Sequence, residues 1–240
     1  MTVDKRAHNA PRRRKPPEGA SARRPARTQA ERRAHTRRAL LDAALLQMGA
    51  GESFDALSLR SVAKAAGVVP GAFYRHFASM DELGLALIDE SSRALREMLR
   101  SARHGLPAKA VIRHSVEILV RTVRDNRQHF TFMFRSRSSA NAVLRYAIRS
   151  EIRLFASELA TDLARFPMLR EWTTDDLGML AGLLVNAMIA TVESLLETSP
   201  DDKATEAEIA RVAEDQLRLT ILAVPHWRSG RRRIAGAQSG

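Results

Sequence analysis

Three neighbouring hydrogen-bond donors, Tyr74, Arg75 and His76, are the residues whose types and spacing point most clearly to chemistry. A phenol, a guanidinium and an imidazole can all donate hydrogen bonds, and a guanidinium pairs with phosphate through two parallel bonds. Phe73 and Phe77, four residues apart, are spaced to be buried on the other side of the same segment. The pattern predicts a short helix that presents a row of donors to an anionic partner.

The segment before these donors has the pattern of another short helix. Ser58 can cap its N-terminus, Val62 and Ala63 lie on one apolar face, and Gly67 can adopt the positive φ of a tight turn. Two short helices joined by such a turn have helix-turn-helix spacing. An ordinary helical hairpin explains the spacing but not the exposed donors. The small residues at 69–72 would let the second helix approach base edges in a major groove.

The charge distribution favours a polyanionic partner near the N-terminus. The 240 residues include 39 Lys and Arg against 27 Asp and Glu, a formal net charge of +12. Residues 1–38 contribute +10 and residues 226–240 contribute +4, so the body between them is close to neutral. The alternative is that the basic ends only keep the protein in solution. We expect 1–28, which four prolines interrupt, and 226–240 to be disordered basic tails.

The body has helical patterns throughout. Ala, Leu, Arg and Glu dominate, aromatic residues make up 5%, and the β-branched and aromatic runs typical of strands are missing. Apolar residues recur at helical spacing from about Thr28 to Pro225. These patterns predict an all-α fold of about nine helices.

Residues 177–196 are apolar almost all round and long enough to span a bilayer. Asn186 and Glu193 interrupt the run, no basic segment flanks it, and its small residues would let another helix pack closely. We therefore expect a buried or interface helix and no membrane partner. The chain has no cysteine and no secretory pattern, which favours a cytoplasmic location.

Residues with the spacing of a catalytic or metal site are missing from the sequence. The seven histidines never fall three or four apart, as two metal ligands on one helix would. The sequence also has neither a phosphate-binding glycine loop nor the G-x-S-x-G of a nucleophile elbow. We expect no enzyme activity, no cofactor and no metal; a helical enzyme is the weak alternative.

The segment from Phe54 to Leu83, FDALSLRSVAKAAGVVPGAFYRHFASMDEL, closely resembles the DNA-binding domain of the TetR family of bacterial repressors. The resemblance implies a homodimer that binds a palindromic operator in double-stranded DNA. Each subunit would have a three-helix helix-turn-helix domain, at 29–80, and a larger helical domain for ligand binding and dimerisation, at 81–225. Residues 177–196 and 205–223 would form the dimer interface as a four-helix packing.

Roles carry over from the family to the matching positions. Tyr74 and His76 match phosphate contacts, and Met80 stands where many members have a phosphate-binding Lys. The basic segment before the first short helix, including Arg32 and Arg37, could replace that contact or only solvate the chain. The residues expected to bind DNA are Arg37, Ser58, Arg60, Val69, Pro70, Gly71, Ala72, Tyr74, Arg75 and His76.

Two longer stretches, FYRHFASMDELGLALIDES and FMFRSRSSANAVLRYAIRSEIRLFASELATDL, are similar to the branch of fatty-acid-biosynthesis repressors typified by FabR and DesT. That likeness implies an effector such as a long-chain acyl-CoA, whose acyl chain lies between helices of the C-terminal domain. An arginine cluster at 121–149 could meet its phosphates. The residues expected to bind the effector, each of which could equally be core, are Val116, Leu119, Val120, Val123, Phe130, Met133, Phe134, Arg135, Ile148, Ile152, Phe155 and Met188.

The sequence therefore predicts a repressor of lipid or fatty-acid metabolism genes that an apolar effector modulates. The closest alternative keeps the DNA-binding half, but its effector is a drug, a steroid or another hydrophobic small molecule, and its target is an efflux or catabolic operon. A second alternative, from a different class, is a protein that coats nucleic acid without sequence preference through its basic tail.

Overall fold

The computed structural model describes residues 28–102 and 108–230, and these residues form an all-α fold, as predicted. Nine α-helices and three short 3-10 helices occur within the described ranges, and no strand does. In chain order they are α1 (Gln29–Gly49), η1 (Phe54–Ala56), α2 (Leu59–Ala65), α3 (Pro70–Phe73), α4 (Met80–Ala102), α5 (Ala108–Asp125), α6 (Arg127–Ser136), α7 (Ala142–Leu163), η2 (Pro167–Leu169), α8 (Thr174–Glu197), α9 (Lys203–Ala223) and η3 (Val224–His226).

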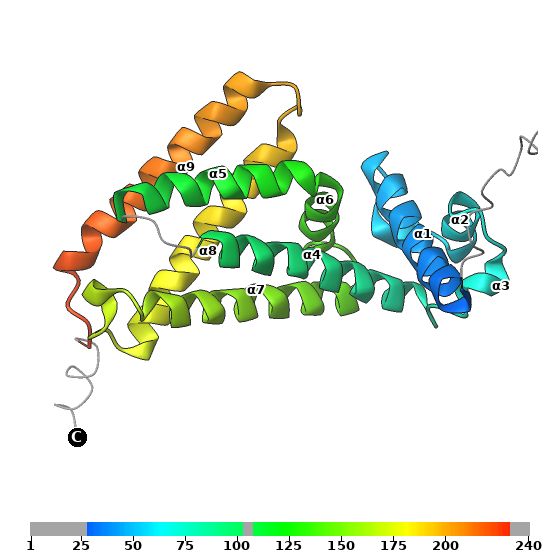
Figure 1. Ribbon diagram of the computed structural model, residues 1–240, viewed down its shortest axis with the longest axis horizontal. Coiled ribbons are helices and arrows are strands. Elements are labelled where there is room, and N and C mark those ends of the chain that lie inside the picture. The colour runs from blue at the N-terminus through cyan, green and yellow to red at the C-terminus, as the bar shows by residue number, and fades with distance from the viewer. Residues whose placement is uncertain (1–27, 103–107, 231–240) are drawn as a thin grey trace, which may run out of the picture.

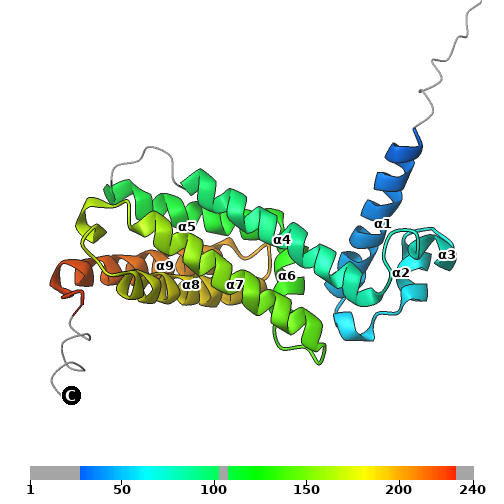
Figure 2. The ribbon, with the colours of Figure 1, turned by 90° about the horizontal axis from the view of Figure 1, so that it is seen from below.

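The first three helices form a small unit at one end of the long axis (Figures 1 and 2). Thr28 caps α1 in a capping box with Glu31, and Ser58 caps α2 in the same way with Ser61. The side chain of Ser79 accepts a hydrogen bond from the backbone N–H of Glu82 at the start of α4. Side-chain caps therefore help to fix where α1, α2 and α4 begin.

Helix α4 leaves this unit and runs into the larger one, where α5 and α7 lie on either side of it in Figure 1. Helix α6 is short and stands between α1 and the longer helices, and α7 packs along α8. Helices α8 and α9 form an adjacent pair in both views (Figure 2). Helix α4 thus connects the small N-terminal unit to the larger one along the chain, and α6 connects them by packing against α1.

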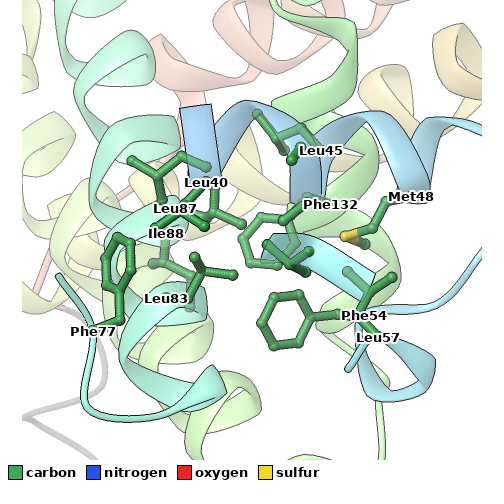
Figure 3. Close-up of a cluster of buried hydrophobic side chains, with 14 of the residues drawn as sticks. Leu40, Leu45, Met48, Phe54, Leu57, Phe77, Leu83, Leu87, Ile88 and Phe132 are labelled. Atoms are coloured by element: carbon green, nitrogen blue, oxygen red, sulfur yellow. The ribbon is translucent and has the colours of Figure 1, made fainter. Parts of the chain in front are cut away.

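One hydrophobic core spans the junction between the two units (Figure 3). Phe132 of α6 is fully buried against the N-terminal helices, with its ring 5.6 Å from the ring of Phe54 in an edge-to-face arrangement. Leu144 and Ile148 of α7 belong to the same cluster. Because interiors are close-packed, a movement of α6 or α7 must be passed on to α1 and η1.

Helix α8 is long and apolar enough to cross a membrane by length and composition alone, a test that core helices of soluble proteins also pass. It packs on α7 and α9, as a core or interface helix does. Asp175 and Asp176 lie in its first turn and Asp202 caps α9, so these acidic residues mark helix N-termini.

The structured chain continues to Gly230, beyond the predicted end of the C-terminal domain at 225. Asp176 accepts hydrogen bonds from the Ser229 hydroxyl at 2.6 Å and the Gly230 N–H at 2.9 Å, and Trp227 packs near Trp172. These bonds fasten residues 229 and 230 to the start of α8. Two tails were predicted, at 1–28 and 226–240. Of these, residues 1–27 and 231–240 lie outside the described residues.

Candidate DNA-binding surface and effector cavity

The turn between α2 and α3 is fixed by backbone contacts and one glycine. Gly67 has φ of +70°, a conformation that residues with a side chain rarely adopt. The N–H of Val68 donates to the carbonyl of Ala63 at 2.9 Å and so closes the turn. Phe73 is fully buried and holds α3 against α2. This is helix-turn-helix geometry, and it leaves the opposite side of α3 in solvent.

The exposed side of α3 carries the residues that the sequence singled out. Val69 is 71% exposed and Tyr74 is 64% exposed, although large apolar or aromatic side chains are commonly buried. Pro70, Gly71 and Arg75 are exposed as well. Ala72 and His76 are half-buried at the edge of this surface. The structure thus brings together the seven predicted DNA contacts between 69 and 76.

Positive charge converges on His76. Burial is the largest cause that lowers the pKa of His76 below its ordinary value of 6.5, and the guanidinium groups of Arg33, Arg37 and Arg75 lower it further. Arg33 and Arg37 belong to α1, so two elements bring positive charge to one place. Such a cluster is suited to phosphate groups, which would neutralise it.

The remaining three predicted contacts lie in different settings. Arg60, near the start of α2, is exposed. The Ser58 hydroxyl accepts a hydrogen bond from the N–H of Ser61, so it is already engaged as a helix cap. Arg37 stacks over the Phe77 ring, 5.1 Å from its centroid, and lies 4.0 Å from a carboxylate oxygen of Glu90.

A mainly apolar cavity of about 80 Å³ lies in the larger unit, between α4, α6, α7 and α8. Its polar lining consists of Ser92 and three charged residues, Arg96, Glu151 and Arg137. Arg96 and Glu151 neutralise one another through an ion pair of 2.6 Å between α4 and α7. A cavity with apolar walls and a few polar groups is typical of small-molecule sites.

Seven of the twelve predicted effector residues line this cavity, from three different helices. Four others, from α5, lie elsewhere: Val116 is buried away from it, Leu119 is buried in the core beside it, and Val120 and Val123 border a smaller hollow near the end of α8. The twelfth, Arg135, donates to the carbonyl of Met48 in α1 and so bridges the two units. The seven that line the cavity are Phe130, Met133, Phe134, Ile148, Ile152, Phe155 and Met188.

The predicted arginine cluster is dispersed. Arg124 pairs with Glu206 of α9, and Arg145 donates to the carbonyls of Ser139 and Ala140. Arg121 and Arg149 are exposed on α5 and α7. Arg137 is the member of the cluster that lines the cavity.

Sequence reasoning did not single out the cavity residues of α4 and most of those of α8. Their periodicity marks them as ordinary core, since a cavity lining and a packed core use the same apolar residue types. Ser92 and Arg96 were detectable in principle, because they are polar residues four positions apart on the helix face that also carries Leu95. These residues are Ser92, Leu95, Arg96, Val185, Ile189 and Val192, with Glu151 from α7.

Two sequence profiles of one family match most of the described chain. Residues 40–87 match that of the bacterial regulatory proteins of the tetR family, and residues 108–222 match the tetracyclin repressor-like C-terminal domain. The chain belongs to the TetR family of DNA-binding transcriptional regulators. Its helix-turn-helix unit is therefore the DNA-binding part.

Solved structures with the same fold include a transcriptional regulator from Pseudomonas aeruginosa, with a TM-score of 0.62 and 16% identity over 85% of this chain and 97% of that one. FadR from Bacillus subtilis, solved with stearoyl-CoA, has a TM-score of 0.60 and 15% identity over 76% and 96%. AibR, solved with isovaleryl coenzyme A and operator DNA, has a TM-score of 0.57 and 14% identity over 75% and 96%. At these identities the likeness concerns the fold.

Proposed function

We propose that this regulator is a repressor of lipid or fatty-acid metabolism genes that binds a palindromic operator as a homodimer and is released by an acyl thioester. The observation that carries the proposal is the apolar cavity in the larger unit, because α4, the helix that carries the DNA-binding unit, forms one of its walls. A ligand that binds between α4 and α7 and favours one arrangement of these helices would act on the position of the DNA-binding helices.

The volume of the cavity bears on how a long acyl chain could enter. A cavity of about 150 Å³ holds benzene, whereas this one measures about 80 Å³. A long acyl chain therefore has to move the walls apart. The Arg96–Glu151 ion pair joins α4 to α7 across the cavity, and it is the contact most exposed to such a displacement. Effector binding would separate these two helices.

Helix α6 provides a second route to the DNA-binding unit. Phe130, Met133 and Phe134 line the cavity, while Phe132 of the same helix is buried in the junction core against Phe54. An effector that pushes on one side of α6 would therefore also displace its other side, which packs against η1 and α1. The two routes act on the same small unit.

Dimerisation through α8 and α9 completes the proposal. Leu219 is 72% exposed and Leu222 is 70% exposed near the end of α9, and Leu183 is exposed on α8. Exposed apolar side chains on two adjacent helices favour a partner surface. In a two-fold dimer the recognition helices must lie about 34–36 Å apart to reach successive major grooves. A displacement of a few ångströms would then lower operator affinity.

FadR and AibR, which have the same fold, were solved with acyl-CoA compounds of very different chain length. Their ligands support an acyl thioester for this chain. The alternative effector is another hydrophobic small molecule, such as a drug or a steroid, in a regulator of an efflux or catabolic operon. The apolar walls of the cavity would accept either kind of compound.

Fluorescence anisotropy of labelled DNA from upstream of the gene tests the proposal, with scrambled DNA of equal length as the control. We expect tight binding to the upstream DNA alone, weakened by palmitoyl-CoA or isovaleryl-CoA and unaffected by a panel of drugs and steroids. Specific binding that ignores both thioesters would refute the acyl effector. Equal binding to both DNAs that deletion of 1–28 abolishes would instead support a protein that coats nucleic acid through its tail.

A further inference from the structure

The strongest unexplained feature of the cavity is the hydroxyl of Ser92. The residue is 3% exposed, lines the cavity, and has no hydrogen-bond partner for its Oγ among the described residues. Buried polar groups in proteins are nearly always hydrogen-bonded. A serine in a helix can satisfy its hydroxyl by donating to the carbonyl four residues earlier, which for Ser92 is that of Ile88. Ser92 does not do so.

The preceding residue shows that this helix allows such a bond. The hydroxyl of Ser91 donates to the carbonyl of Leu87 at 2.8 Å and also lies 3.1 Å from Nδ1 of His129. Two adjacent buried serines thus differ: the protein satisfies the hydroxyl of Ser91, whereas Ser92, one of the residues that line the cavity, has a hydroxyl without a partner among the described residues. A donor left in this position is suited to an acceptor on a ligand.

Arg137 gives the same cavity a positive charge. Arg96, the other lining cation, is occupied by Glu151 at 2.6 Å and by Glu158 at 3.5 Å. The guanidinium of Arg137 stacks over Phe134, 5.1 Å from the ring centroid, and makes no ion pair with a carboxylate in residues 28–102 and 108–230. The Arg137 side chain is partly exposed, whereas Ser92 is buried. Ser92 is therefore the inner polar group of the cavity lining, and Arg137 is the outer one.

We infer that the effector is an acyl compound whose carbonyl oxygen accepts a hydrogen bond from Ser92 and whose anionic group pairs with Arg137. The apolar chain lies against the walls formed by α7 and α8. This inference rests on the proposed function and specifies the chemistry of its effector. Either a fatty-acid carboxylate or the phosphates of coenzyme A supply the anionic group, since a guanidinium binds both.

Calorimetric titration of the full-length protein with three ten-carbon ligands separates the two roles. Decanoate has one carboxylate, whose two oxygens both accept hydrogen bonds and share the charge. Methyl decanoate has an ester carbonyl and no charge, and decanoyl-CoA has a thioester carbonyl and separate phosphates. We expect Ser92→Ala to weaken all three ligands by about five- to tenfold, as the loss of one hydrogen bond does. Arg137→Gln should weaken about tenfold whichever of the two anionic ligands its guanidinium binds, and leave methyl decanoate unchanged. Comparing decanoate with decanoyl-CoA in the Arg137 variant identifies which anion the guanidinium holds.

Thermal unfolding distinguishes a ligand contact from a structural one. Removing a buried hydroxyl without a partner costs no stability, so Ser92→Ala should have the Tm of the wild type or a higher one. Ser157→Ala and Arg153→Gln, both at exposed positions of α7, are the matched controls and should bind all three ligands normally.

Three results would overturn the inference. The first is wild-type affinity of Ser92→Ala for every ligand, and the second is an equal loss of charged and uncharged ligands in Arg137→Gln. The third is a clear fall in the Tm of Ser92→Ala, which would show that the protein itself uses the hydroxyl. Each of these leaves the acyl effector in place, whereas a wild-type protein that binds none of the ligands would refute the proposed function as well.

Discussion

Gly84→Ala tests how tightly α4 is packed where it leaves the DNA-binding unit. A Cβ at Gly84 would lie 2.7 Å from Cδ2 of Leu144 in α7 and 3.0 Å from Cζ of Phe54 in η1. Non-bonded carbons prefer about 3.5–4.0 Å. Both neighbours are buried, Leu144 completely, so neither can move into solvent. The methyl group must therefore force α4 away from α7 or distort the junction core.

The magnitude follows from two opposing terms. Replacing glycine by alanine inside a helix stabilises by about 1 kcal/mol, and overpacking a core costs about 1–3 kcal/mol. We expect a net loss of about 1 kcal/mol, or a Tm lowered by about 2–4 °C for a chain of this size. Differential scanning calorimetry on wild type and variant measures the shift.

Leu144→Val is the matched control, because it removes the Cδ atoms that the new methyl group would meet. The double variant should lose less stability than the two single variants added together, since the two side chains contact each other. A Gly84→Ala protein with a raised Tm, or strict additivity with Leu144→Val, would refute the close packing of α4 on α7.

Three further predictions concern DNA binding and the contact between Asp176 and residues 229–230. Arg75→Ala should weaken operator binding by about 1–3 kcal/mol if the guanidinium contacts a base edge, and anisotropy with unchanged affinity would remove Arg75 from the interface. Operator affinity should rise as the pH is lowered from 8 towards 6, because the pKa of His76 is below 6.5 in the free protein and a phosphate would raise it; a His76→Gln protein with the same pH dependence would contradict this. Hydrogen bonds from Ser229, Gly230 and Thr173 lower the pKa of Asp176 to about 2. The stability that this carboxylate contributes is present above about pH 4 and disappears as the pH falls towards 2. The urea midpoint of Asp176→Asn should therefore depend less on pH over that interval than the midpoint of the wild type. An unchanged pH dependence in the variant would disprove the contact.

The fold class and the DNA-binding surface could be predicted from the sequence because their signals are local. Ser58, Gly67 and Pro70 each fix a cap, a turn or a helix start within a few residues. The alternation of buried Phe73 and Phe77 with exposed Tyr74 and Arg75 is also local. The structure brings the candidates between 69 and 76 to one surface, where five are exposed and Ala72 and His76 are half-buried.

The cavity could be predicted in part, because its lining depends on how four helices meet. Phe130 and Phe132 are two residues apart in α6, and both are apolar and buried, yet one lines the cavity and the other enters the junction core. Val123 has the same residue type as a lining residue, but α5 turns it towards the smaller hollow. Periodicity identifies the buried face of a helix, whereas the neighbour that covers it is decided by tertiary packing.

The contacts of the arginines were equally beyond the sequence. Arg135 reaches the Met48 carbonyl in α1 and Arg124 reaches Glu206 in α9, and both partners are more than 80 positions away along the chain. Long side chains choose among partners that only the fold brings near. Arg137 was one member of a predicted cluster, and its position at the cavity became distinct only through these other pairings.

The distance between the two DNA-binding units of a dimer is the most direct test of the account. The chain contains no cysteine, so Lys64→Cys, at an exposed position of α2, allows a single spin label per subunit. Pulsed dipolar spectroscopy should give one narrow distance distribution on operator DNA, set by the spacing of about 34–36 Å between recognition helices. Palmitoyl-CoA should shift that distribution by several ångströms and free the DNA. A distribution that stays unchanged while the thioester binds would contradict the coupling between the cavity and the DNA-binding helices.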